Sequence, residues 1–318
     1  MHDRPVIFLM GPTASGKTDL AAALFDRHDA ELVSVDAAQV YRGMDIGTAK
    51  PARDLLRRYP HHLIDIRAPH ETWSAAEFRD HALTLIGHIH ARGKLPILVG
   101  GSMFYFSALE NGLSELPAAD PGARARISRE MEQRGPAAMH KRLQRIDAAL
   151  AAAIRPSDPQ RIQRALEIHR LTGCAPSEVM RRSAARRFPF PLIKLGLFTA
   201  DRRVLHARIE TRFRRMLARG LVGEVEAIAA TLGDAGRQPS MRTVGYRQVL
   251  GFLRNELTYD EMTAKGVAAT RQLAKRQLTW LRQQSNLVWV DASARPPVDS
   301  VCVYLQKRIE MVRGRAAG

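Results

Sequence analysis

The amino-acid sequence predicts an α/β fold in which a parallel β-sheet is flanked by helices and carries an all-α insertion. Two observations lead to this fold class. Short apolar runs alternate with helical patterns over residues 1–110, and a long section without strand patterns interrupts this alternation further on. Short apolar runs separated by helices are typical of parallel strands that are buried on both faces of a sheet.

The elements of the first part follow from this alternation in order. We expect four strands, at residues 6–10, 31–35, 62–66 and 96–99. Helical patterns cover residues 17–28 and 75–92. Because ligands collect at the carboxyl ends of parallel strands, the segments that follow these strands should surround one crevice.

Beyond residue 120 the pattern changes to Arg-studded, Ala-rich helical periodicity, which continues to about residue 185. Strand patterns then return at residues 192–198 and 288–291. The helical section therefore interrupts the sheet and is not an appended domain. We expect an α/β core at residues 1–119, a helical insertion at 120–188, and a return to the core with basic carboxyl-terminal helices at 189–318.

The net charge of +17 is unevenly distributed over the 318 residues. Residues 1–120 carry −3, whereas residues 121–190 and residues 202–282 carry +9 each. This segregation indicates a polyanionic partner for the second part of the chain, although a generally Arg-rich proteome would also raise the charge. No apolar run reaches the roughly 18 residues of a membrane span. The two cysteines match no metal spacing, and we expect a cytoplasmic protein. No dimerisation signal is visible, so a monomer is the default expectation.

Residues 11–18, GPTASGKT, match the pattern G-x-x-x-x-G-K-[ST] after a strand and at the start of a helix. The glycines allow several backbone N–H groups to converge on phosphate oxygens, and the helix amino terminus adds partial positive charge. Lys17 would neutralise the outer phosphate, and the Thr18 hydroxyl could ligate Mg²⁺. We call these residues the phosphate loop. They specify the fold class further, as a P-loop NTPase-like sheet.

Polar residues follow two other expected strands. Asp36 follows the second strand, where a carboxylate beside bound phosphate must bind metal or accept a proton; a helix cap is the alternative interpretation. Gly100-Gly101-Ser102 follows the fourth strand and permits close approach of a ligand, as would any tight turn. His61 and His62 are adjacent, so one should be packed and the other exposed.

Two basic helical faces stand out in the second part of the chain. Arg161 and Arg164 are one helical turn apart, which suits phosphates or a stacked base; a solvated basic helix would look the same. A second stripe contains Arg271, Lys275, Arg276 and Arg282. The nearby Trp280 is expected in the core.

Together these motifs resemble those of the tRNA dimethylallyltransferases, and they occur in the order of that family. The resemblance rests on the phosphate loop, on Asp36 with Gln39 and Tyr41, and on residues 45–51, 61–65, 98–102, 158–161, 244–247 and 274–280. Four positions depart from the usual residues of the family. Ala37 replaces serine, Ser102 replaces threonine, Met103 replaces a frequent glycine, and Leu273 replaces an aromatic residue.

The resemblance implies transfer of a dimethylallyl group from dimethylallyl diphosphate to N6 of adenosine-37 in the anticodon stem-loop of tRNA, with Mg²⁺ as cofactor. It implies catalytic roles for Asp36, Lys17, Thr18 and Thr13. The diphosphate would bind Gly11, Pro12, Thr13, Ala14, Ser15, Gly16, Lys17, Thr18 and Arg212. The tRNA would contact Asp36, Ala37, Ala38, Gln39, Ser102, Arg124, Gln160, Arg161, Ile162, Gln163, Arg164, Arg242, Thr243, Val244, Gly245, Tyr246 and Arg247.

Three other functions remain as alternatives at this point. A small-molecule kinase shares the phosphate loop but needs an arginine-bearing lid, for which the basic insertion is large. An isopentenyltransferase of free adenine nucleotides shares the loop and Asp36 but has little use for that insertion. An RNA-binding module needs no lysine in a phosphate loop.

Overall fold

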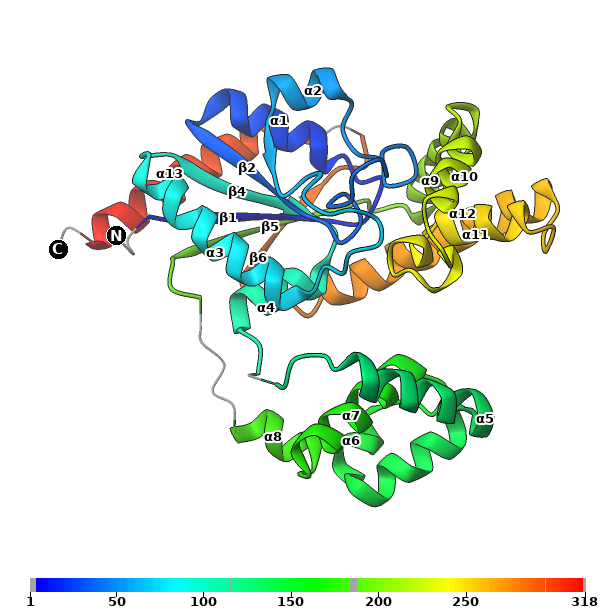
Figure 1. Cartoon of the computed structure of the whole chain (residues 1–318). Helices are drawn as coiled ribbons and strands as arrows, with labels where there is room; N and C mark the ends of the chain where they lie inside the picture. Colours follow the sequence, from blue (N-terminus) through cyan, green and yellow to red (C-terminus); the bar gives the residue numbers. More distant parts are fainter. Residues whose placement is uncertain (1–3, 115, 183–187, 295, 317–318) are drawn as a thin grey trace. The chain divides into compact units, whose positions relative to one another are not determined.

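The computed structural model describes residues 4–114, 116–182, 188–294 and 296–316, and the chain divides into two compact units. One unit combines residues 1–110 with residues 189–318, and the other contains residues 111–188. The first unit holds a sheet of six parallel strands in the order β3-β2-β4-β1-β5-β6 (Figure 1). This architecture confirms the predicted α/β fold class. The strands are β1 (Val6–Met10), β2 (Ala30–Val35), β3 (His61–His62), β4 (Leu95–Gly100), β5 (Leu192–Phe198) and β6 (Leu287–Asp291).

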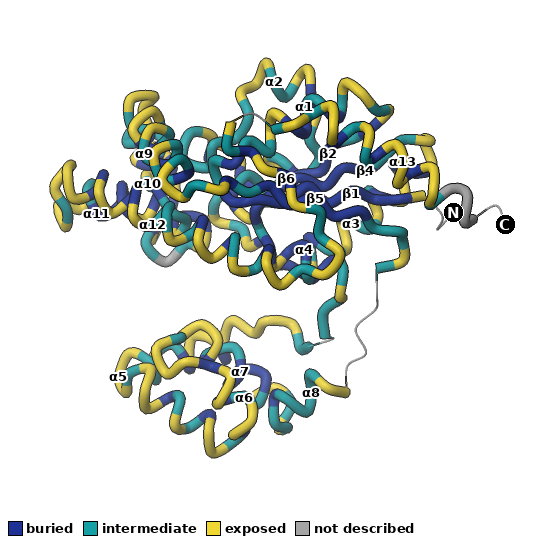
Figure 2. The backbone as a smooth tube through the Cα atoms, turned by 180° about the vertical axis from the view of Figure 1, so that it is seen from behind, coloured by how far each residue is buried: buried dark blue, intermediate teal, exposed yellow. Residues whose placement is uncertain are grey.

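The apolar sequence of β1 explains its central place in the sheet. Each of its residues is fully buried, and the strand pairs with β4 on one side and β5 on the other. Leu9 is aligned with Val99 of β4 and with Leu195 of β5. Figure 2 shows the buried strands enclosed by helices whose outer faces are exposed.

Helices cover both faces of the sheet (Figure 1). On one face, Leu24 of α1 (Lys17–Arg27) and Leu305 of α13 (Val298–Ala316) belong to one apolar cluster with the strands. On the other face lie α3 (Ala75–Ala91) and α4 (Met103–Asn111), where the ring of Phe106 lies 4.9 Å from that of Phe8. A short helix, α2 (Arg53–Arg58), precedes β3. No helix in the described residues combines the length and the apolarity that a membrane crossing requires.

The third strand is shorter than the sequence predicts. It contains only His61 and His62, whereas residues 62–66 were expected. Leu63 and Asp65 have φ angles of 65° and 58°, and this left-handed conformation ends the extended backbone. The two histidines are both half-buried, so the expectation that one is packed and the other exposed is also wrong.

A layer of helices continues the chain after β5. It consists of α9 (Arg202–Ala218), α10 (Leu221–Ala230), α11 (Tyr246–Leu253) and α12 (Tyr259–Leu281), with two short 3₁₀ turns at Ala235–Arg237 and Ser240–Arg242. Leu205 and Ile209 of α9 pack against Ala274 of α12, and this cluster also touches Ala14 of the phosphate loop. The contact brings α9 and α12 to the carboxyl edge of the sheet, where β1 ends.

The second unit contains helices and no strand among its described residues. Its helices are α5 (Pro121–Ile146), α6 (Ala148–Ala153), α7 (Pro159–Thr172) and α8 (Pro176–Arg182). The backbone of α5 is kinked at Gly135, whose φ of 76° and following proline interrupt the helical hydrogen bonds. Side chains such as Met139, Leu143 and Ile162 form a separate core.

Close backbone approach at Gly100 gives a test of the sheet packing. A Cβ at Gly100 would lie 2.0 Å from the carbonyl oxygen of Val35, which cannot move without breaking the strand pairing. We expect Gly100→Ala to lower the free energy of unfolding by about 3 kcal/mol. Gly87→Ala is the matched control, because this exposed position of α3 has nothing within 4 Å of the added carbon. It should stabilise the protein by about 0.5–1 kcal/mol. If urea unfolding showed the same change in the free energy of unfolding for Gly100→Ala and Gly87→Ala, this account of the sheet packing would be contradicted.

Candidate active site

The phosphate loop connects β1 to α1 and wraps around its own lysine. Ala14 and Gly16 have left-handed φ angles of 63° and 86°, which turn the chain into the start of α1 at Lys17. The Nζ atom of Lys17 donates hydrogen bonds to the carbonyl oxygens of Gly11 at 2.9 Å and Pro12 at 2.7 Å. The lysine therefore lies inside the loop, next to the backbone N–H groups that would meet an anion.

Burial changes the proton affinity of this lysine. Loss of hydration and, to a smaller extent, the nearby Arg212 guanidinium lower the pKa of Lys17 to about 7, against an opposing effect of Asp36. A bound polyphosphate would reverse this shift, because an opposite charge favours the ammonium form. The loop is therefore a site that gains positive charge when an anion enters.

Arg212 comes from α9 and joins the phosphate loop although the two are far apart in sequence. Its Nη1 atom lies 3.4 Å from the hydroxyl oxygen of Thr13. Burial lowers the pKa of Arg212, and the negative charge of Asp36 opposes this effect. The structure thus brings together Lys17, Thr13 and Arg212, which the sequence analysis assigned to one diphosphate site.

Asp36 lies at the carboxyl end of β2 and faces the same space. Its Oδ1 atom accepts hydrogen bonds from the backbone N–H groups of Ala38 at 2.8 Å and Gln39 at 3.2 Å. Burial raises the pKa of Asp36, while these two hydrogen bonds and the charges of Lys17 and Arg212 oppose the rise. The N–H of Ala37 donates to the hydroxyl of Ser102 at 3.0 Å, which joins the ends of β2 and β4.

Gln277 of α12 connects three parts of the site and was missed by the sequence analysis. Its Oε1 atom accepts a hydrogen bond from the N–H of Thr13, and its Nε2 atom donates to the carbonyl oxygen of Gly101, both at 2.9 Å. The side chain is 9 % exposed. Its signal in the sequence is a polar residue among the apolar positions of a helix, since buried amides require partners.

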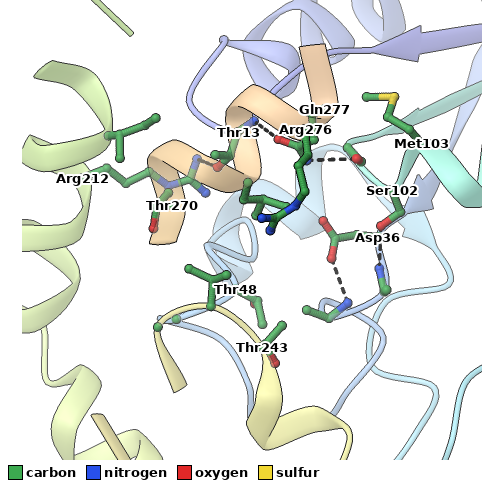
Figure 3. A pocket seen from close by; sticks show the side chains of 18 of the residues that line it. Thr13, Asp36, Thr48, Ser102, Met103, Arg212, Thr243, Thr270, Arg276 and Gln277 are labelled. Atoms are coloured by element: carbon green, nitrogen blue, oxygen red, sulfur yellow. Dashed lines mark hydrogen bonds between the residues drawn. The ribbon is translucent and has the colours of Figure 1, made fainter. Parts of the chain in front are cut away.

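Two cavities meet at the site formed by the phosphate loop, Asp36, Arg212 and Gln277. The larger has a volume of about 510 Å³ and the smaller, which contains most of the phosphate loop, about 360 Å³. Figure 3 shows Arg212 and Thr270 on one side of the larger cavity, with Asp36, Ser102 and Met103 on the other. Six residues line both cavities: Thr13, Asp36, Thr48, Gly101, Arg212 and Gln277. A molecule with an anionic and an apolar part could therefore bind here, with its anionic part in the smaller cavity and its apolar part in the larger.

The family model described as IPP transferase matches residues 39–284 of the chain. The chain belongs to the IPP transferase family. The tRNA dimethylallyltransferase of Nitrosococcus oceani is 52% identical over 302 residues, which cover 95% of this chain and 96% of the relative. The tRNA dimethylallyltransferase of Nitrosomonas eutropha is 48% identical over 302 residues and 95% of each chain.

Solved structures of this family have the same fold. The tRNA isopentenylpyrophosphate transferase of Bacillus halodurans has a TM-score of 0.73 and 34% identity, with 99% of this chain and 100% of that chain covered. A eukaryotic dimethylallyltransferase acting on tRNA has a TM-score of 0.74 and 25% identity, with 92% of this chain and 74% of that chain covered. The four residues that the sequence analysis singled out as departures from the family pattern all line the larger cavity: Ala37, Ser102, Met103 and Leu273.

The segment at residues 242–247 is divided between the cavity and the core. Its first four residues line the larger cavity. Tyr246 is fully buried, and its hydroxyl donates to Glu224 at 2.5 Å. Arg247 is exposed. The sequence-based contact of Tyr246 with a substrate would therefore have to come from its backbone.

Glu224 is a second residue that the sequence analysis missed. Its carboxylate accepts hydrogen bonds from three successive N–H groups, those of Asp45 at 2.9 Å, Ile46 at 2.7 Å and Gly47 at 3.0 Å. These bonds hold the loop whose residues Gly47 and Thr48 line the larger cavity. Nothing in the local sequence distinguishes Glu224 from a solvated acidic residue.

Trp280 also lies at the larger cavity, where it is half-buried. Its expected place in the core is therefore wrong. The apolar face of α12 is divided between the core, which receives Ala274 and Leu281, and the cavity, which receives Leu273 and Trp280. Helical periodicity identifies an apolar face but does not distinguish these two destinations.

The basic residues of the helical unit have different surroundings. Glu167 is fully buried and accepts hydrogen bonds from Arg124 at 3.0 Å and from Arg164 at 2.7 Å. Ile162 is fully buried in the core of this unit. Arg161 has 66% of its side-chain area exposed, and its Nε atom lies 3.5 Å from a carboxylate oxygen of Asp158.

The two glutamines of the predicted tRNA segment also differ from each other. Gln160 is exposed at the start of α7. Gln163 donates hydrogen bonds to the carbonyl oxygen of Arg124 and to the hydroxyl of Ser128. Gln160 is thus open to a partner, whereas Gln163 joins α7 to α5.

A magnesium ion would have to share its ligands with a substrate. No three His, Cys, Asp or Glu side chains lie close enough to hold a metal ion within the described ranges of the chain. Thr18 is exposed at the start of α1, and its hydroxyl is one suitable oxygen ligand. Because Mg²⁺ is commonly held by few protein oxygens together with substrate phosphates and water, this donor set fits it.

The low pKa of Lys17 gives a pH prediction for anion binding. Below about pH 7 the free protein carries the ammonium form, and above it the neutral amine predominates. We therefore expect the affinity for inorganic diphosphate to fall as pH rises from about 7 to about 9. Lys17→Arg is the control, because arginine keeps its charge over this range. The pH dependence of diphosphate affinity in this variant therefore reflects only the ionisation of diphosphate itself. If calorimetric titrations gave the same pH dependence of diphosphate affinity for the wild-type protein and for Lys17→Arg, the low pKa of Lys17 would be contradicted.

Proposed function

We propose that the protein transfers a dimethylallyl group from dimethylallyl diphosphate to N6 of adenosine-37 in the anticodon loop of tRNA and releases diphosphate. One observation carries the proposal. Residues suited to a diphosphate, to a proton and to an apolar chain meet where the two cavities join. The names of the relatives, tRNA dimethylallyltransferase and tRNA isopentenylpyrophosphate transferase, support the same reaction.

The phosphate loop stabilises the leaving group in this reaction. The bond between the allylic carbon and its oxygen breaks, and the electron pair departs with the diphosphate. Lys17, Arg212 and the N–H groups of the loop face the negative charge that develops on the diphosphate oxygens. When bound next to Thr18, Mg²⁺ would neutralise part of the same charge.

Asp36 accepts the proton that the adenine amine loses. The N6 lone pair is delocalised into the ring, so the amine must be deprotonated as its bond to carbon forms. Burial has already raised the proton affinity of Asp36. Both backbone hydrogen bonds of the carboxylate go to Oδ1, which fixes the orientation in which Oδ2 can meet the amine.

The acceptor adenosine would enter the larger cavity from the solvent side. It must leave its stack in the anticodon loop, which costs a few kcal/mol. Contacts of the surrounding RNA with basic residues offset this cost, and exposed residues such as Arg242 and Arg161 are suited to phosphates. The helical unit supplies part of this charge, because residues 121–190 carry +9, as residues 202–282 also do.

The alternative functions fit the geometry less well. A kinase transfers a phosphoryl group and has no use for the apolar wall formed by Ile209, Phe213 and Leu273. An isopentenyltransferase of free nucleotides uses that wall, but its acceptor would need no basic helical unit. The monomeric state and the cytoplasmic location stay predictions from the sequence.

The reaction is tested by incubating the protein with dimethylallyl diphosphate, Mg²⁺ and unmodified tRNA, followed by digestion and mass spectrometry. We expect N6-dimethylallyladenosine at position 37. Asp36→Asn should lower kcat by about 100-fold or more, because its amide oxygen can keep both backbone bonds while the proton acceptor is lost. The affinity for tRNA should change little.

Three results would contradict the proposal. Product formed on free AMP but not on tRNA would favour the nucleotide isopentenyltransferase. Phosphorylation of a small acceptor by ATP would favour the kinase. An equal loss of tRNA affinity and kcat in Asp36→Asn would show that the carboxylate serves binding and not proton transfer.

Arg161 provides a separate test of tRNA contact. We expect Arg161→Ala to weaken tRNA binding and to reduce the slope of log affinity against log salt concentration by about 1, as loss of one phosphate contact does. Arg170→Ala is the control, because this residue is also exposed on α7 but lies outside the predicted segment. An unchanged salt slope in Arg161→Ala would contradict the phosphate contact.

A further inference from the structure

An apolar stripe on α9 begins beside the arginine that faces the phosphate loop. It consists of Ile209, Phe213 and Met216, whose spacing places them on one face of the helix. All three line the larger cavity, and Arg212 lines both cavities. A chain attached to a diphosphate at Arg212 would therefore meet this stripe first.

A matching face of α12 leads away from the phosphate loop. Gln277, Leu273 and Thr270 line the larger cavity, and Gln277 contacts the N–H of Thr13. The hydroxyl of Thr270 donates to the carbonyl oxygen of Gly266 at 2.8 Å, which satisfies its polar atom within the helix. At 1.5 Å per residue, the face from Gln277 to Thr270 extends about 10 Å.

The ring of Phe213 stands at the next position along this face. Gly266 lies one helical turn beyond Thr270, and a Cβ there would be 2.1 Å from Cζ and 2.5 Å from Cε1 of Phe213. On another side, a Cβ at Gly245 would lie 3.8 Å from Cε2 of the same ring. Phe213 is 3% exposed, although it lines the cavity. The ring therefore rests on the backbone of α12 and cannot withdraw from the cavity.

We propose that Phe213, seated on Gly266, limits the length of the alkyl chain of the donor and makes the site selective for a five-carbon group. This inference rests on the proposed function and deepens it. A five-carbon chain bound to a diphosphate in the phosphate loop ends along the Leu273 and Thr270 face. A ten-carbon chain would overlap the ring, which packed protein interiors do not accommodate without strain.

The test compares kcat/KM for dimethylallyl diphosphate and geranyl diphosphate with the same tRNA, in the wild-type protein and in Phe213→Leu. We expect the ratio of geranyl to dimethylallyl transfer to rise at least about tenfold in the variant. Phe8→Leu is the matched control, since Phe8 is fully buried in β1 and does not line either cavity. It should lower thermal stability without changing the ratio.

A second pair of variants tests the seat of the ring. Gly266→Ala should push Phe213 into the cavity and lower kcat/KM for dimethylallyl diphosphate, and adding Phe213→Leu should restore it. The inference is overturned if the donor ratio is unchanged in Phe213→Leu, or if the double variant shows no rescue. In either case the proposed function still stands as long as the wild-type protein transfers the dimethylallyl group to tRNA. A wild-type protein that transfers no dimethylallyl group to tRNA overturns both.

Discussion

This site depends on keeping ionisable side chains buried, away from the water that would hydrate their charges. Lys17, Arg212 and Asp36 come from three separate elements, and burial shifts the pKa of each toward its neutral form. Opposite charges compensate part of this cost, since Asp36 favours the charged forms of both cations. An entering diphosphate would complete the compensation. The site is thus arranged to bind an anion.

The fold brings these charges together by using one edge of the sheet and one pair of helices. The carboxyl ends of β1, β2 and β4 provide the phosphate loop, Asp36 and the Gly100-Gly101-Ser102 turn. α9 and α12 provide the opposite wall, which is apolar apart from a few polar side chains such as Arg212 and Gln277. Gln277 joins the two halves through hydrogen bonds to Thr13 and Gly101. A polar and an apolar binding region thereby share one boundary.

Much of this could be predicted from the sequence, because strong local signals carried it. The apolar run of β1, the phosphate loop and Asp36 each depend on a few adjacent residues, and the predicted sheet is confirmed. β3 was placed wrongly because left-handed residues at Leu63 and Asp65 leave no hydrophobic signal. Gln277, Glu224 and Trp280 depend on contacts between distant segments, which periodicity does not specify. The helical insertion was recognisable from composition, whereas the partners of its arginines depend on the buried Glu167.

The central claim is that diphosphate, proton acceptor and alkyl chain meet where the two cavities join. A crystal structure with dimethylallyl thiodiphosphate and Mg²⁺ tests it most directly, through the position of the allylic carbon. The account predicts the diphosphate in the phosphate loop, the allylic carbon between Thr13 and Asp36, and the methyl groups against α9 and α12. A diphosphate bound elsewhere, or an alkyl chain directed past Thr18 and Asp19 into solvent, would contradict it.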